Sequence, residues 1–126
     1  MFEAIDGGKN VRYHRIPYAL RMTATRRETS VRPSAALNAH RSEIREIVKA
    51  NKAMNPRVFG SVAHGDDKDG SDLDILVDPT PETSLLDIGI IQDTLVQLLG
   101  VEVDVLTPKA LPESFRATVI AEAKPV

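Results

Sequence analysis

Hydrophobic residues recur at helical spacing in three stretches of the chain. This spacing predicts helices over 34–51, over 84–99 and from Pro112 onward. We expect Ser34 to cap the first helix, and Ser84 with Asp87 to form a capping box on the second. The residues expected to face the core are Leu37, Ile44, Ile47 and Val48, then Ile88, Ile91, Leu95, Leu98 and Leu99, and finally Phe115, Val119 and Ile120.

Between these stretches, hydrophobic and polar residues alternate or form short apolar runs that predict strands at 57–59, 71–78 and 101–106. A helical turn at 61–65 and a polar loop at 66–70 separate the first two strands. The order helix, strand, strand, helix, strand, helix predicts an α/β fold, a small mixed β-sheet with helices packed on it. The expected buried face carries Leu73, Ile75, Val77, Val101, Val103 and Val105, and the opposite face carries Asp72, Asp74, Leu76, Glu102, Asp104 and Leu106.

Charge divides the chain of 126 residues into two unlike parts. Residues 1–33 carry a net charge of +4 and lack clear periodicity, whereas 34–126 carry −6. We therefore expect a poorly ordered basic N-terminal arm over 1–33 and one domain over 34–126. Two alternatives for the arm are an over-long start, with Met22 as the true initiator, and a contact surface for a partner or nucleic acid.

Composition excludes several classes of protein. The chain has no cysteine, which excludes disulfides and cysteine-based zinc sites and suits a reducing cytoplasm. No apolar run approaches the roughly 18 residues of a membrane span, and the start lacks the apolar segment of a secretory signal. Aromatic residues make up only 4%, so the core should be aliphatic. We expect a cytoplasmic protein without a membrane partner.

Three carboxylates form the main candidate site. Asp72 and Asp74 lie two apart on a predicted strand, so both side chains point to the same side, about 7 Å apart. Asp104 lies near the centre of a strand that could neighbour theirs. Carboxylates placed in this way repel one another unless a cation lies between them, and Mg²⁺ prefers oxygen ligands together with substrate phosphates. The alternative is that these acids mark the solvent face of an edge strand.

A glycine turn precedes the carboxylates. Gly60 follows a predicted strand and precedes a helical turn, so backbone N–H groups can point at an anion. Ser61 adds a hydroxyl donor, and Gly65 permits a positive φ as the chain leaves the turn. Alone, this pattern is also ordinary turn chemistry. Together with the three acids, it predicts a site for a nucleoside triphosphate on divalent metal.

The stretch G-S-V-A-H-G-(x5)-S-D-L-D-I-L-V-D, with the later V-D-V, resembles the nucleotidyltransferase superfamily that includes DNA polymerase beta. Its short members are the minimal nucleotidyltransferase (MNT) proteins, antitoxins of HEPN/MNT toxin–antitoxin pairs. The resemblance covers roughly Pro33 to the C-terminus and implies the nucleotidyltransferase fold. It does not cover residues 1–32.

The resemblance implies that Asp72, Asp74 and Asp104 are catalytic and ligate two Mg²⁺ ions. Asp104 would also help to deprotonate the acceptor hydroxyl. The nucleotide-binding residues would be Gly60, Ser61, Gly65 and Ser71. The implied reaction is transfer of AMP from ATP to a tyrosine of a HEPN ribonuclease toxin, which silences the toxin. Many relatives carry Arg where this chain has His64, which would weaken a phosphate contact.

Two other functions remain open from the sequence. The chain could neutralise a toxin by contact alone, in which case Arg57, the basic arm and the exposed helix faces would matter more than Asp104. It could also transfer a nucleotide to a small molecule such as an antibiotic, although such enzymes usually add a second domain or subunit to hold the acceptor. Nucleic-acid binding is not expected.

Overall fold

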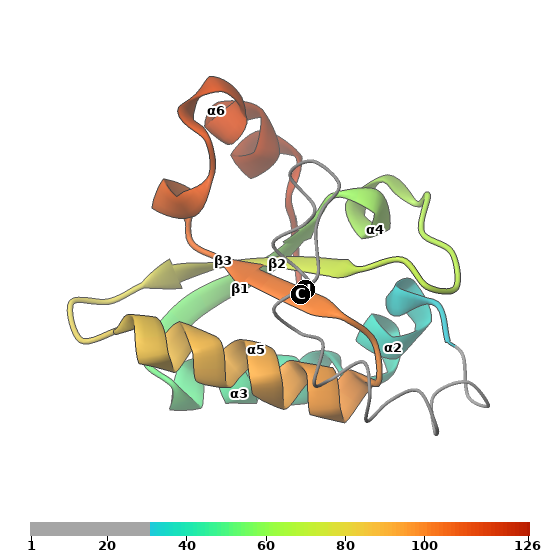
Figure 1. The fold of residues 1–126 in the computed structure, drawn as a ribbon, viewed down its shortest axis with the longest axis horizontal. Helices are drawn as coiled ribbons and strands as arrows, with labels where there is room; N and C mark the ends of the chain where they lie inside the picture. The colour runs from blue at the N-terminus through green and yellow to red at the C-terminus, as the bar shows by residue number, and fades with distance from the viewer. Residues whose placement is uncertain (1–30) are drawn as a thin grey trace, which may run out of the picture. The chain divides into compact units, whose positions relative to one another are not determined.

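A four-stranded sheet forms the centre of the computed structural model, which describes residues 31–126 (Figure 1). The strands are β1 (Ala53–Phe59), β2 (Leu73–Pro79), β3 (Val103–Leu106) and β4 (Lys124–Pro125), in the order β3-β2-β1-β4. β1 runs antiparallel to β2 and β4, whereas β2 and β3 are parallel. The predicted mixed sheet is confirmed. Residues 1–30 of the predicted arm lie outside the described range.

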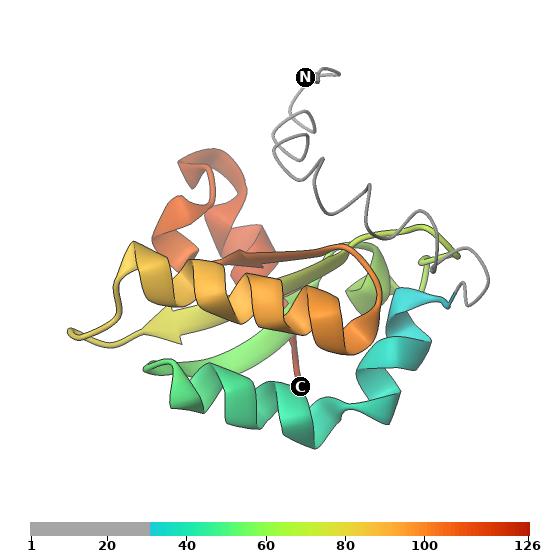
Figure 2. The same cartoon turned by 60° about the horizontal axis from the view of Figure 1, so that its bottom comes forward.

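Helices lie on both faces of this sheet. α3 (Arg41–Ala50) and α5 (Leu85–Leu99) cover one face, and α6 (Glu113–Glu122) lies over the other (Figure 2). The shorter helices are α2 (Pro33–Ala39), α4 (Ser61–His64) and the 3₁₀ turn η3 (Pro108–Ala110). None of the helices described is both long and apolar enough to cross a bilayer.

The core lies between the sheet and the pair α3 and α5, and it is aliphatic as predicted. Alternate residues of the strands point into it, because side chains alternate between the two faces of a sheet, and Leu76 is buried on the opposite face of β2. Helix α5 contributes Ile91, Leu95 and Leu99 from one stripe. The largest fully buried side chains of the described residues are those of Ile44, Leu73, Ile75, Leu76, Ile91, Leu95, Val48, Val77, Val96, Val103 and Pro33.

The predicted first helix is wrong in two respects. It is interrupted at His40, whose φ of −133° and ψ of 26° separate α2 from α3. It also begins at Pro33, with Arg32 rather than Ser34 at the N-cap position. Proline fits the first helical position because that residue needs no amide hydrogen and its φ is already helical. Ser34 is therefore the second helical residue.

Strand β1 is longer than predicted, because the segment before Pro56 joins the sheet through an irregular register between Met54 and Arg57. Asn55 takes a positive φ of 56° there, which asparagine tolerates better than most residues. Proline is compatible with a strand at such a bulge. The sequence pattern also missed β4, whose Lys124 pairs with Val58.

The prediction for the last helix is wrong about its buried face. No residue of α6 is buried, and Phe115 and Ile120 are 47% and 41% exposed. The helix lies over the sheet face that α3 and α5 do not cover. Arg116 helps to hold its start, because one guanidinium nitrogen donates to the carbonyl of Leu111 at 2.9 Å.

The capping box at the start of α5 is confirmed. The backbone amide of Asp87 donates to the hydroxyl of Ser84 at 3.2 Å, and the backbone amide of Ser84 donates to the Asp87 carboxylate at 2.8 Å. Both amides would otherwise lack partners at the helix end.

Replacing Ser84 with Ala should lower the free energy of unfolding by about 1 kcal/mol, because one N-terminal amide loses its acceptor. In a domain of this size that corresponds to a fall in melting temperature of about 4–8 °C. Thermal unfolding followed by circular dichroism would measure it. Gln97→Ala on the same helix is the control, and an equal melting temperature for both variants would contradict the prediction.

Candidate functional site

Asp74 and Asp104 lie side by side on the sheet face opposite α3 and α5. They are register partners in the parallel pair of β2 and β3, where neighbouring strands are about 4.8 Å apart. Both residues are half-buried, and both alternate with buried valine, leucine or isoleucine on the core side. The structure therefore brings two of the predicted carboxylates together on one face.

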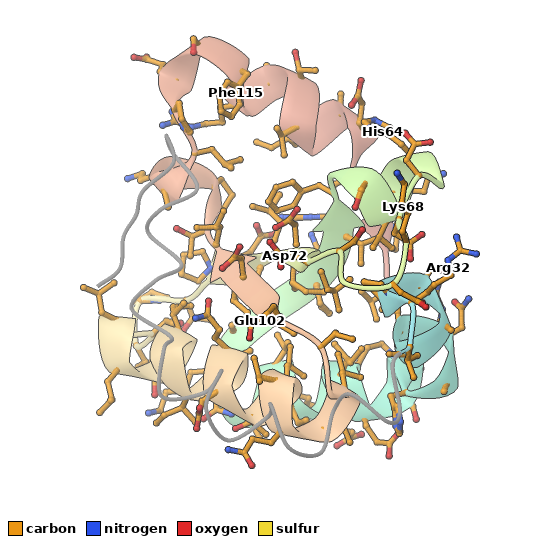
Figure 3. The ribbon with its side chains drawn as sticks, turned by 45° about the vertical axis from the view of Figure 1, so that its right-hand side comes forward. Arg32, His64, Lys68, Asp72, Glu102 and Phe115 are labelled. Carbon is orange, nitrogen blue, oxygen red and sulfur yellow. The ribbon has the colours of Figure 1, made fainter. Side chains whose placement is uncertain are left out.

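Asp72 directly precedes β2, two residues before Asp74. The next amide, of Leu73, donates to the carbonyl of Glu102 at 2.9 Å, so the strand pairing continues to this point. Asp72 is half-buried and lies on the side of the sheet that α6 overlooks (Figure 3). All three predicted acids thus come from the same end of two adjacent strands.

Gly60 lies directly against Asp74. It links β1 to α4 with a φ of 73° and a ψ of −147°. Residues other than glycine rarely adopt these backbone angles. A Cβ atom added there would lie 2.5 Å from Oδ2 of Asp74. The turn can therefore approach the carboxylate only because this position is glycine.

The other residues predicted to bind a nucleotide surround this turn. Ser61 is the first residue of α4, and its carbonyl accepts from the amide of Asp66 at 2.9 Å. Gly65 ends α4 in the left-handed region, with a φ of 79°. The hydroxyl of Ser71 accepts from the amide of Lys68 at 2.9 Å, so it also fixes its own loop.

His64 contacts α6. Its Nε2 lies 2.9 Å from Oε1 of Glu122, and both side chains are about half exposed. Figure 3 shows this histidine on α4 next to the end of α6. His64 therefore links α4 to α6 beside the proposed site.

Asp67 was missed by the sequence reasoning, which placed it in a solvated loop. Its side chain is fully buried, and its carboxylate accepts from the backbone amide of Ser34 at 2.8 Å. A guanidinium nitrogen of Arg32 lies 3.3 Å from its other oxygen. Asp67 thus caps α2 from a distant part of the chain. One acid among several charged loop residues gave no sequence signal for this contact.

Burial raises the pKa of Asp67, but hydrogen bonds from the amide and hydroxyl of Ser34 and the charge of Arg32 outweigh that effect. In the folded protein, the pKa of the Asp67 carboxyl therefore lies below its ordinary value of 3.8. A carboxyl with a depressed pKa stabilises the fold above its unfolded pKa, and that contribution is lost as the pH falls through the folded pKa.

The difference in melting temperature between the native chain and Asp67→Asn should therefore be constant from pH 7 to 5. It should shrink below about pH 4, where the unfolded carboxyl takes up its proton. Calorimetry across this range measures the difference, with the exposed Asp69→Asn as control. A difference that grows toward low pH would contradict the assignment.

The donor atoms at the site suit a hard divalent cation. Within the described residues there is no preformed group of three or more acidic or histidine side chains that could hold a metal ion. Asp74 and Asp104 are nevertheless adjacent oxygen donors on one face, with Asp72 beside them. Mg²⁺ typically takes one or two protein carboxylates and completes its coordination with water and substrate phosphates. The residues present therefore fit such an ion.

Sequence comparison identifies relatives of this arrangement. The model of a family described as nucleotidyltransferase domain matches residues 41–126. Protein adenylyltransferase MntA of Thermococcus cleftensis is 37% identical over 86 residues, which are 68% of this chain and 84% of that protein. A candidate protein adenylyltransferase of Methanocaldococcus jannaschii, MJ0435, is 33% identical over 69% of this chain and 94% of its own length.

Solved structures agree with the fold. A candidate minimal nucleotidyltransferase superposes with a TM-score of 0.67 at 36% identity, covering 74% of this chain and 95% of that one. A chain from a toxin–antitoxin complex solved with AMP-PNP gives a TM-score of 0.58 at 21% identity, covering 67% and 69%. At that lower identity the likeness concerns the fold.

Proposed function

The chain belongs to the nucleotidyltransferase domain family, and we propose that it is an antitoxin that transfers AMP from ATP to a tyrosine of a HEPN-type toxin. One of the relatives is named protein adenylyltransferase and another candidate protein adenylyltransferase, which supports the type of reaction. The toxin–antitoxin complexes among the structural neighbours support the type of partner.

The arrangement of Asp74, Asp104 and Gly60 is the observation in this chain that best supports the proposal. Asp74 and Asp104 are register partners, and the Gly60 turn lies against the Asp74 carboxylate. A triphosphate bound by the turn would therefore have its phosphates beside the two acids. This is the relation that nucleotidyl transfer needs, because the catalysis is mainly positioning and electrostatic stabilisation.

In the proposed reaction, the acceptor oxygen attacks the α-phosphorus of ATP. The new bond is the phosphate ester of AMP, and the bond that breaks is the one to pyrophosphate, which leaves with the electron pair. Asp104 helps to take the proton from the acceptor hydroxyl and passes it to solvent. Gly60, Ser61, Gly65 and Ser71 hold the triphosphate from the turn and its loop.

Asp72, Asp74 and Asp104 would hold two Mg²⁺ ions. When bound, these ions supply positive charge to the reacting phosphate and activate the attacking oxygen. The carboxylates themselves fix where that charge lies, since two of them are held by adjacent paired strands rather than by a loop.

The decisive experiment mixes the full chain with the protein encoded by the neighbouring gene, α-labelled ATP and Mg²⁺. We expect label on the partner, and mass spectrometry should locate AMP on a tyrosine. A tight complex without label would support neutralisation by contact alone. Label on a small-molecule acceptor but not on the partner would support the antibiotic-type transferase.

A further inference from the structure

The loop over 66–71 connects the turn at Gly60 and α4 to the acids at the start of β2. On one side it follows Gly65, which ends the helical turn after Gly60, and on the other it leads directly into Asp72. Asp72 directly follows the loop at the start of β2, so the position of the loop influences where the Asp72 carboxylate lies.

Two glycines with positive φ shape the backbone of this loop. Gly65 directly before the loop and Gly70 within it have φ values of 79° and 89°, and a Cβ at either position would meet nothing within 4 Å. Two hydrogen bonds of the loop have both partners within 61–71. The amide of Asp66 donates to the carbonyl of Ser61, and the amide of Lys68 donates to the hydroxyl of Ser71. They shape the loop, but they do not fix it to the rest of the domain.

Asp67 supplies the external attachment. Its side chain is fully buried, and both carboxylate oxygens are used, one by the amide of Ser34 at 2.8 Å and the other by Arg32 at 3.3 Å. Both donors belong to the start of α2, more than thirty residues earlier in the chain. Figure 3 shows Arg32 at this end of α2, on the same side of the domain as Lys68 of the loop.

We infer that Asp67 is a positioning residue for nucleotidyl transfer, because it fixes the loop that sets Asp72 relative to the Gly60 turn. The inference rests on the proposed function. The loop is attached through Asp67 to helix α2, which is itself held in the domain by its buried residues Pro33, Ala36 and Leu37. The first amides of that helix lack intrahelical acceptors, so a carboxylate from the loop satisfies one of them.

This role differs from simple stabilisation in what it predicts. If Asp67 only stabilised the domain, its loss would lower activity only by the fraction of chains that unfold. If it positions Asp72, the folded variant should itself be impaired, since a misplacement of about 1 Å can lower a rate about 100-fold. The impairment should appear in kcat and in nucleotide binding together.

The test compares Asp67→Ala with Asp67→Asn and Ser84→Ala in the full chain, at a temperature where all three are folded. Asp67→Ala should lower AMP transfer about 10- to 100-fold. Asp67→Asn should keep activity within a few-fold of the native chain, because its amide oxygen still accepts from Ser34. Ser84→Ala is the matched control, since it also removes a helix cap but lies at the start of α5.

A second readout does not depend on catalysis. Calorimetric titration with a non-hydrolysable ATP analogue and Mg²⁺ should show weaker binding for Asp67→Ala, and hydrogen exchange at the amides of 66–72 should accelerate. Equal loss of activity in Asp67→Ala and Ser84→Ala, or unchanged exchange in the loop, would overturn the inference. If the native chain transferred no AMP to a partner, the proposed function would fail, whereas binding and exchange would still decide the role of Asp67.

Discussion

Asp74→Asn is expected to lower AMP transfer by at least about 1000-fold while the domain stays folded. The substitution keeps the size of the side chain but removes the charge that a divalent cation needs, and metal electrostatics contribute several kcal/mol to such reactions. Each 1.36 kcal/mol corresponds to a factor of ten in rate. Transfer of α-labelled ATP to the partner measures the loss, and circular dichroism checks the fold.

Asp78→Asn is the matched control for this result. Asp78 lies four residues further along β2, but its carboxylate pairs with Arg57 at 2.7 Å rather than with the proposed site. Its loss should affect stability more than transfer. Asp72→Asn should behave like Asp74→Asn, and native rates in both of these variants would exclude the proposed metal site.

Gly60→Ala is expected to have the second-largest effect, because it combines backbone strain with a clash in the site. Its φ of 73° and ψ of −147° should cost a non-glycine residue about 1–3 kcal/mol of stability. The added methyl would also meet Oδ2 of Asp74 at 2.5 Å, so the carboxylate or the turn must move. We expect transfer to fall at least about 100-fold, by analogy with other losses of site geometry.

Gly100→Ala separates the two causes. Gly100 has a φ of 72° and a ψ of 18°, in the left-handed helical region at the end of α5, and a Cβ there would meet nothing within 4 Å. It should lose less stability than Gly60→Ala, because the left-handed helical region is more accessible to alanine, and it should retain transfer. Comparable transfer by the two variants would show that the approach of the turn to Asp74 has no catalytic importance.

The sequence predicted the parts of the site that depend on short-range pattern. Alternation with period two fixed which face Asp74 and Asp104 share, since a shift of one residue would bury both charges. The family resemblance then supplied the roles proposed for them. The turn at Gly60 followed from local residue chemistry, and its contact with Asp74 follows from the pairing of Phe59 with Asp74.

The features that sequence reasoning missed depend on contacts between distant segments. Asp67 is buried because α2 offers an unpaired amide more than thirty residues away, which no local pattern records. Phe115 and Ile120 follow helical spacing, but α6 lies over the less covered face of the sheet, so neither is buried. The break at His40 likewise follows no proline or glycine signal.

The parallel pairing of β2 and β3 also determines when the site can exist during folding. Parallel neighbours require a crossover connection, here provided by α5 between Pro79 and Val103. Asp74 and Asp104 are thirty residues apart in the chain, so no local hairpin or helix can bring them together. A refolding chain with α5 formed but β3 still undocked would have secondary structure without adjacent carboxylates. The proposed site should therefore form only in the kinetic phase in which β3 joins the sheet.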